Sequence, residues 1–194
     1  MIDAISEGAG ASPDLKRTKR VRRAQTSSAN IDRLPPHDVD MERGVLGCQL
    51  ISPNECVGQV IDKLKGTAVE AHYDLRHQTI QAELLEMYDQ RIPIDVLTLQ
   101  RRLKDKQLLE QVGGIAYLAG LPDAVPSAAN LSYYTDIVQE KFLLRKMIHT
   151  CTDVVGRVYE FEGEVDMLMD EVERDILRIS ESREIGRASC RERV

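Results

Sequence analysis

The sequence predicts an all-α protein in which a small helical bundle is followed by a long projecting helical hairpin. Two general observations support this fold class. Apolar residues recur every three or four positions along most of residues 34–183. Only 4% of the 194 residues are aromatic, and Leu, Ala, Glu, Arg and Asp are abundant, which favours helices. A third observation concerns residues 130–183, where the pattern continues long enough for two extended helices joined at Gly163.

Residues 1–33 are predicted to be a disordered basic tail. They are rich in Ser, Ala, Gly and charged residues and show almost no apolar periodicity. One interpretation is an electrostatic arm for DNA or RNA. The other is a solvated tail, or a start codon assigned too early. The basic cluster consists of Lys16, Arg17, Lys19, Arg20, Arg22 and Arg23.

Residues 34–129 are predicted to form the helical bundle, and its first helices have recognisable start signals. Asp38 is placed to cap the first helix. Ser52, followed by Pro and by Glu55 three positions on, predicts a capping box for the second. A third helix is predicted through residues 80–88 from its apolar spacing.

The second half of the bundle contains two shorter helices. Asp95 is predicted to cap one of them, and Gly113-Gly114 is predicted to open the other. Pro122 and Pro126 are then expected to form the bend that leads into the hairpin, because proline interrupts a continuing helix.

Residues 130–183 are predicted to form the hairpin, with Asn130 as N-cap and a first arm that ends near Glu162. The first arm has two apolar flanks, whereas the second arm has one stripe about 100° wide. One stripe cannot cover both flanks, and each apolar side chain left in water forgoes ~1.5–3 kcal/mol. The body of the domain, a partner or a second copy is therefore expected to cover the rest; the alternative is a self-contained bundle with a loose edge. The predicted interface residues are Ile137, Leu144, Met147, Ile148, Val155, Tyr159, Val165, Leu168, Val172 and Ile176.

Charge is distributed unevenly along the chain. Residues 1–33 contain seven Lys/Arg against four Asp/Glu, whereas residues 34–183 contain 16 against 26, a net charge of −10. An acidic folded part argues against a broad nucleic-acid footprint. Carboxylates around the hairpin turn could form a docking face for a basic partner or an ordinary solvated surface. Lys141 and Arg145 are candidates for ion pairs across the hairpin.

No catalytic or metal-binding set is predicted, and no cofactor is expected in this chain. Cys48, Cys56 and Cys151 lie on apolar faces and are expected to be buried. His77 and His149 are interpreted as structural or surface residues. No apolar run approaches the ~20 residues of a membrane span, so we expect no membrane contact and a cytoplasmic location.

Several short motifs recur in an order and spacing that resemble a known family. They are Val45-Leu46-Gly47, His77, residues 93–99 (Pro-Ile-Asp-x-x-Thr-Leu), residues 112–118 (Val-Gly-Gly-Ile-Ala-Tyr-Leu), residues 125–130 (Val-Pro-Ser-Ala-Ala-Asn) and residues 134–145 (Tyr-x-x-Ile-Val-x-x-Lys-x-x-x-Arg). This order is similar to the N-terminal domain of DnaB-type bacterial replicative DNA helicases. One departure is His72-Tyr73, where the family more often has an Asp-Phe-Tyr-like aromatic pair.

The resemblance implies a collar domain that serves ring assembly and primase docking. In that family, hairpins of neighbouring subunits pair within a six-membered ring, and the ATP-driven motor is a separate domain. ATP, Mg and most DNA contacts are therefore implied for the motor. A phosphate-binding loop of the motor type needs a Gly-Lys pair, which this sequence lacks. This chain alone is not expected to hydrolyse ATP or unwind DNA.

Residues 184–194 do not continue the apolar pattern and resemble the translation of a sequencing adapter. We therefore expect the natural gene to continue past Arg183 into a linker and motor. Two other hypotheses stay open. The chain can be a stand-alone helical adaptor without enzymatic activity, or a nucleic-acid-binding module led by the basic arm.

Overall fold

The first helix of the bundle is its central element, since every residue from Gly44 to Leu50 is buried. The other helices pack around it, and the described residues contain no strand, so the predicted all-α class is confirmed. The elements are α1 (Val39–Ile51), α2 (Pro53–Leu64), α3 (Leu75–Asp89), α4 (Val96–Asp105), α5 (Gly114–Asp123), the 3₁₀ turn η2 (Ala128–Asn130), α6 (Leu131–Glu160) and α7 (Val165–Ala188).

The computed structural model describes residues 34–188, with side chains described through Ile179. All of these elements belong to the compact unit that begins at Pro35. The predicted basic arm, Lys16 to Arg23, lies outside the described residues. No helix in the described part is long and apolar enough to span a membrane.

Helix α1 separates two apolar clusters. Leu46 and Leu50 face the cluster formed with α3, α4 and α5, whereas Val45 and Cys48 face the cluster formed with α2 and α6. Gly47 permits the closest approach, because a Cβ atom there would lie 2.4 Å from the Leu121 carbonyl oxygen of α5. The bundle is therefore built on a helix that is apolar on most of its circumference.

Several helix starts agree with the sequence. Asp38 accepts a hydrogen bond from the Met41 backbone N–H, and Asp95 and Thr98 form a capping box at the start of α4. Asp74 caps α3, a role that the sequence did not indicate. These caps satisfy backbone donors that have no partner within the helix.

Two predicted caps are wrong. Ser52 makes no side-chain capping bond. Its backbone N–H donates to the Cys48 carbonyl at the end of α1, so it is not available to the Glu55 side chain as a capping box requires. Asn130 precedes α6 but likewise makes no side-chain cap. The chain enters α6 through η2, where Ser127 provides the cap by accepting from the Ala129 backbone N–H.

Three further expectations need correction. Pro122 lies inside the last turn of α5 rather than in the bend that follows. Cys151 is exposed, whereas Cys48 and Cys56 are buried as predicted. Helix α7 continues to Ala188, past the predicted end at Arg183, because extending an existing helix costs little compared with starting one.

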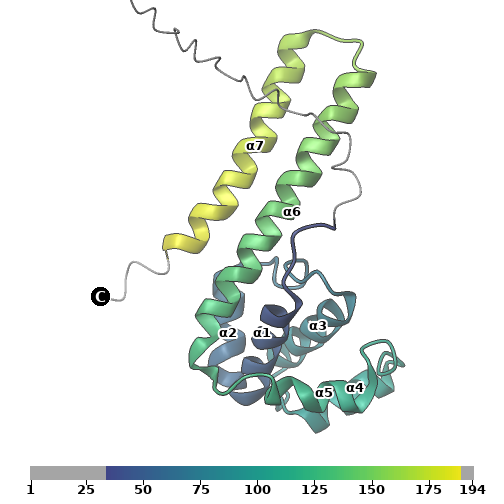
Figure 1. Cartoon of the computed structure of the whole chain (residues 1–194), viewed down its shortest axis with the longest axis vertical. Helices are drawn as coiled ribbons and strands as arrows, with labels where there is room; N and C mark the ends of the chain where they lie inside the picture. Colours follow the sequence, from purple (N-terminus) through teal and green to yellow (C-terminus); the bar gives the residue numbers. More distant parts are fainter. Residues whose placement is uncertain (1–33, 189–194) are drawn as a thin grey trace, which may run out of the picture. The chain divides into compact units, whose positions relative to one another are not determined.

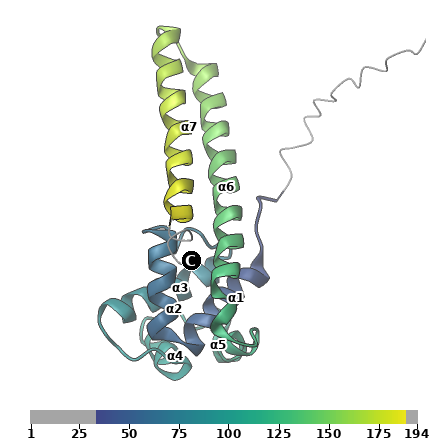
Figure 2. The same cartoon turned by 90° about the vertical axis from the view of Figure 1, so that its left-hand side faces the viewer.

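Helices α6 and α7 form the projecting hairpin (Figures 1 and 2). The 30 residues of α6 span about 45 Å at ~1.5 Å per residue. Its first turns are anchored in the bundle through buried Leu131, Thr135 and Val138. The remainder leaves the bundle and runs beside α7, with the turn at residues 161–164 as its tip.

Candidate interaction surface

The seam between α6 and α7 holds the hairpin together. Leu168 is buried there, with 9% of its surface exposed, and Val154 and Val172 are half-buried. Arg157 of α6 binds two carboxylates of α7, Glu171 at 3.5 Å and Asp175 at 2.5 Å. These contacts occupy only one flank of α6.

The other flank of α6 is left uncovered. Exposure ranges from 38% at Leu144 to 87% at Tyr159. The exposed apolar residues of this stripe are Leu144, Met147, Ile148, Val155, Val158 and Tyr159. Helix α7 also exposes Val165, Met169 and Ile176. Together these nine residues are called the hairpin face below.

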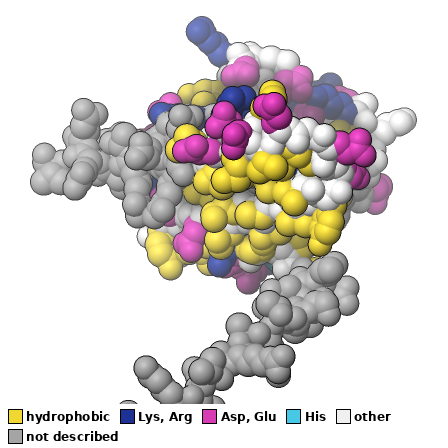
Figure 3. All heavy atoms as spheres, turned by 90° about the horizontal axis from the view of Figure 1, so that it is seen from above, with side chains coloured by type: hydrophobic (Ala, Val, Ile, Leu, Met, Phe, Trp, Pro, Cys, Tyr) yellow, Lys and Arg dark blue, Asp and Glu magenta, His cyan; other side chains and the backbone are white. Residues whose placement is uncertain are grey.

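Both stripes lie on the same side of the hairpin. At ~100° per residue, the α6 stripe is rotated about 110° from the flank that meets α7. The α7 stripe is rotated about 70° from its own contact flank and, because the two helices are antiparallel, it turns toward the same side of the pair. The face of the molecule seen from above carries a patch of hydrophobic side chains with acidic groups beside it (Figure 3). An exposed apolar surface of this kind is typical of an interaction site.

Most of the predicted interface residues lie on this face. Leu144, Met147, Ile148, Val155, Tyr159, Val165 and Ile176 are exposed. Ile137 and Val172 are half-buried, and Leu168 is buried in the seam. Val158 was not singled out from the sequence, although its helical spacing from Val155 places it beside the stripe.

Arg145 fixes the base of the hairpin to the bundle. Its guanidinium donates to the Pro36 carbonyl at 2.9 Å and to the Ala71 carbonyl at 2.6 Å, and it lies over the Tyr73 ring. The predicted ion pair from Arg145 across the hairpin is therefore wrong, because its side chain points into the bundle. Arg157, nearer the tip, makes the ion pairs between the two arms.

A buried network of hydrogen-bonded polar side chains lies beside Arg145. Glu42 of α1 accepts from the backbone N–H groups of Tyr73 (2.6 Å) and Asp74 (3.2 Å). The His77 ring lies between Glu42 Oε2, 2.7 Å from Nδ1, and the Tyr117 hydroxyl, 2.6 Å from Nε2. An ionised carboxylate only accepts, so Nδ1 carries the hydrogen. The interpretation of His77 as structural fits this position.

Burial and hydrogen bonding act in opposite directions on Glu42. Burial raises the pKa of its carboxyl, but the bonds from His77 and the two backbone N–H groups outweigh it and leave the pKa below the usual value. Burial lowers the pKa of nearby His72 to about 4, and its Nδ1 lies 2.9 Å from the Ala68 carbonyl. At pH values well above 4, His72 is therefore neutral in the folded bundle.

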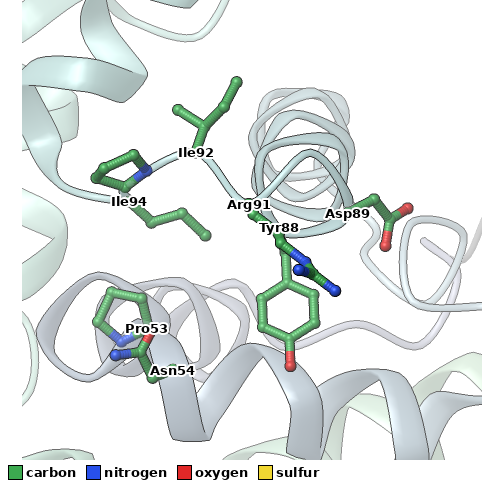
Figure 4. A pocket seen from close by; sticks show the side chains of 8 residues that line it. Pro53, Asn54, Tyr88, Asp89, Arg91, Ile92 and Ile94 are labelled. Atoms are coloured by element: carbon green, nitrogen blue, oxygen red, sulfur yellow. The ribbon is translucent and has the colours of Figure 1, made fainter.

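A separate groove of about 720 Å³ lies between the start of α2 and the α3–α4 turn (Figure 4). Tyr88 reaches from α3 toward α2, where its hydroxyl lies near Gly58. Ile92 and Ile94 supply apolar lining, with Arg91 beside them. No paired acid and base lines this groove, so it offers no general acid–base site.

The chain also matches known proteins. The family model described as DnaB-like helicase N terminal domain matches residues 34–140, more than half of the chain. The chain belongs to this family. The match covers the bundle and the base of α6.

Relatives and solved structures agree with the assignment. The chain is 36% identical over 155 residues to the replicative DNA helicase DnaB of Geobacillus stearothermophilus, covering 80% of this chain and 33% of that protein. It is 40% identical over 149 residues to the DnaB of Rhodothermus marinus, covering 77% and 15%. The crystal structure of the N-terminal domain of DnaB helicase from Mycobacterium tuberculosis matches with a TM-score of 0.67 and 33% identity, covering 75% of this chain and 99% of that one. The chain thus spans a third or less of these two helicases.

Proposed function

We propose that the chain serves as the collar domain of a ring-forming replicative DNA helicase and that its hairpin face binds a second copy of the chain. The observation that carries this proposal is the uncovered apolar face formed jointly by α6 and α7. Family membership supplies the replication context. The cytoplasm is the location that we propose.

We propose that the helicase activity belongs to a part of the whole protein other than the residues that match the N-terminal domain family. The chain spans 33% of the Geobacillus relative. ATP, Mg and the main DNA contacts would belong to a motor domain, since no Gly-Lys pair of a phosphate-binding loop occurs in this sequence. We therefore assign ring assembly, rather than catalysis, to the residues described here.

Primase is the second partner that we propose for the collar. Primase is proposed because of the family resemblance. We assign the hairpin face both to primase docking and to pairing with a second copy of the chain. Calorimetric titration of purified bacterial primase into this chain tests the assignment. Heat of binding is expected. If no heat were released although the chain is shown to be self-associated, primase would be excluded as a partner.

Introducing charge into the hairpin face tests self-association. Replacing both Leu144 and Ile148 by Asp places two carboxylates in the proposed contact, where charge without a partner is strongly unfavourable. Light scattering is expected to give the 21.9 kDa monomer for this variant and at least twice that mass for the wild type. Circular dichroism should show unchanged helix content.

The matched control replaces Met167 and Leu177 by Asp. Both side chains are exposed on α7 but lie off the hairpin face, and the change in net charge is the same. This variant should keep the wild-type mass. If Leu144→Asp/Ile148→Asp also kept that mass, the hairpin face would not be the contact.

A further inference from the structure

We propose that residues 35–37 form a strap that holds the direction in which the hairpin leaves the bundle. The strap, Pro35-Pro36-His37, precedes α1 and belongs to no helix. It runs beside α6 in both views of the chain (Figures 1 and 2). It meets α6 at Arg145, where that helix emerges from the bundle. The contacts of the strap, the position of Arg145 and the length of α6 beyond it together give this segment its conformational role.

The strap is bound at two points. The Pro36 carbonyl accepts a hydrogen bond from the Arg145 guanidinium at 2.9 Å. The His37 ring stacks on the Tyr73 ring, with centroids 4.3 Å apart and planes inclined by 16°. Tyr73 is a fixed support, because its backbone N–H donates to Glu42 at 2.6 Å. Two consecutive prolines restrict the backbone of the strap, so little conformational entropy is lost when it binds.

Arg145 joins the strap to two other segments. It follows Phe142, the last apolar residue of α6 that packs against the bundle core, by three positions. Its guanidinium also donates to the Ala71 carbonyl at 2.6 Å, and burial lowers its pKa. Without the strap, this half-buried cation would keep the Ala71 carbonyl as its hydrogen-bond acceptor among the described residues. The strap therefore supplies one of the two polar restraints on α6 at this point.

The length of α6 beyond Arg145 amplifies any loss of restraint. From Arg145 to its end at Glu160 the helix extends roughly 22 Å, at ~1.5 Å per residue. A tilt of about 10° at Arg145 would move the end of α6 by roughly 4 Å over that length. The strap thus determines how precisely the hairpin face is presented to the partner that covers it.

Distances between two spin labels in the full chain test the strap. One label is attached to the bundle at Lys104→Cys and the other to the hairpin tip at Glu162→Cys, two exposed positions. The background is Cys151→Ser/Cys190→Ser, and the two buried cysteines stay unlabelled. Excess unlabelled chain ensures that each measured distance lies within one chain. A single narrow distance distribution is expected when the strap is intact.

Two variants loosen the strap. His37→Ala removes the ring stack, and Pro35→Gly/Pro36→Gly/His37→Gly also removes the restriction of the backbone. Each should broaden the distance distribution by several ångströms, as a tilt of about 10° over the ~22 Å lever implies. His149→Ala is the matched control, since this histidine is exposed on α6 and pairs within that helix. It should keep the wild-type distribution, and circular dichroism should show unchanged helix content in every variant.

Arg145→Gln separates the strap from the Ala71 contact, because it weakens both hydrogen bonds of the guanidinium. Broadening in either strap variant, with an unchanged His149→Ala control, supports the strap. A wild-type distribution in both strap variants overturns it. If Arg145→Gln alone broadened the distribution, the restraint would belong to the Ala71 contact. Equal broadening in the His149→Ala control would overturn the strap as well.

Discussion

Glu42 shows at the residue scale how a buried charge is retained in this bundle. It is 1% exposed, and its carboxylate joins α1 to the Tyr73–Asp74 segment and, through His77, to Tyr117 of α5. Taking such a charge out of water is costly unless every lone pair finds a donor. The network therefore fixes the mutual positions of α1, α3, α5 and the Tyr73–Asp74 segment, which lies beside the Arg145 anchor of the hairpin.

Glu42→Gln is expected to destabilise the bundle by about 2–4 kcal/mol, because the amide group cannot accept all three hydrogen bonds. Tyr117→Phe removes one hydrogen bond at the outer end of the network and should cost about 1 kcal/mol. Urea unfolding of the two variants checks this order. If both variants lost the same free energy of unfolding, Glu42 would contribute no more to stability than the Tyr117 hydroxyl.

Stability is expected to fall between pH 6.5 and pH 4 because of His72. An imidazole in the unfolded chain titrates near ~6.5, whereas the folded pKa is about 4. Across this window the unfolded state binds a proton that the folded state does not, so acid favours unfolding. The difference corresponds to roughly 3 kcal/mol. As the pH falls further, through the lowered pKa of Glu42, the stability supplied by its carboxylate is lost as well.

The His72→Asn variant isolates this contribution. Its amide can donate to the Ala68 carbonyl as Nδ1 does, but it does not titrate. The free energy of unfolding should depend less on pH between 6.5 and 4 than in the wild type. Exposed His149→Asn is the control and should retain the wild-type pH dependence. A His72→Asn curve parallel to the wild type would exclude His72 as the cause.

At the scale of elements, α1 depends on a close contact that only glycine permits. Gly47→Ala would place a Cβ atom 2.4 Å from the Leu121 carbonyl oxygen and is expected to cost about 1–3 kcal/mol. Gly120→Ala, on α5 itself, meets no heavy atom within 4 Å. It should be neutral or stabilise the protein by up to ~1 kcal/mol, because alanine favours helix over glycine. Thermal unfolding distinguishes the two, and a similar effect of both would contradict the packing described for α1 and α5.

Helices and the hairpin were predictable because their signals are local. The period of apolar residues predicts α6 and α7, and Asp38 and Asp95 cap the helices that directly follow them. The Glu42 network was not predictable, since its partners lie 31 to 35 residues along the chain and a glutamate near a helix start normally faces water. The capping box at Ser52 failed for a related reason, because its backbone N–H donates to the Cys48 carbonyl at the end of α1.

The hairpin face was only partly predictable from sequence. Apolar spacing indicated which residues share a face of each helix, but not which of these faces would be covered by the seam between α6 and α7. The structure places Leu168 in the seam and leaves Val158 and Met169 outside. Cys151 was expected to be buried with the apolar residues around it, yet it lies on the uncovered flank.

At the scale of the whole molecule, the bundle anchors one end of the long α6–α7 hairpin. Arg145 and buried Val138 fix α6 to the bundle, and the seam with α7 supports the part beyond. A two-helix unit with an uncovered apolar face gains stability when a second unit covers it. We therefore expect this chain to self-associate through the hairpin face.

Sedimentation equilibrium of the wild-type chain over a wide concentration range tests that claim most directly. Self-association through the hairpin face predicts an average mass that rises from the 21.9 kDa monomer toward at least twice that value as concentration increases. A mass of 21.9 kDa at every concentration would contradict it and would leave the hairpin face without the partner proposed here.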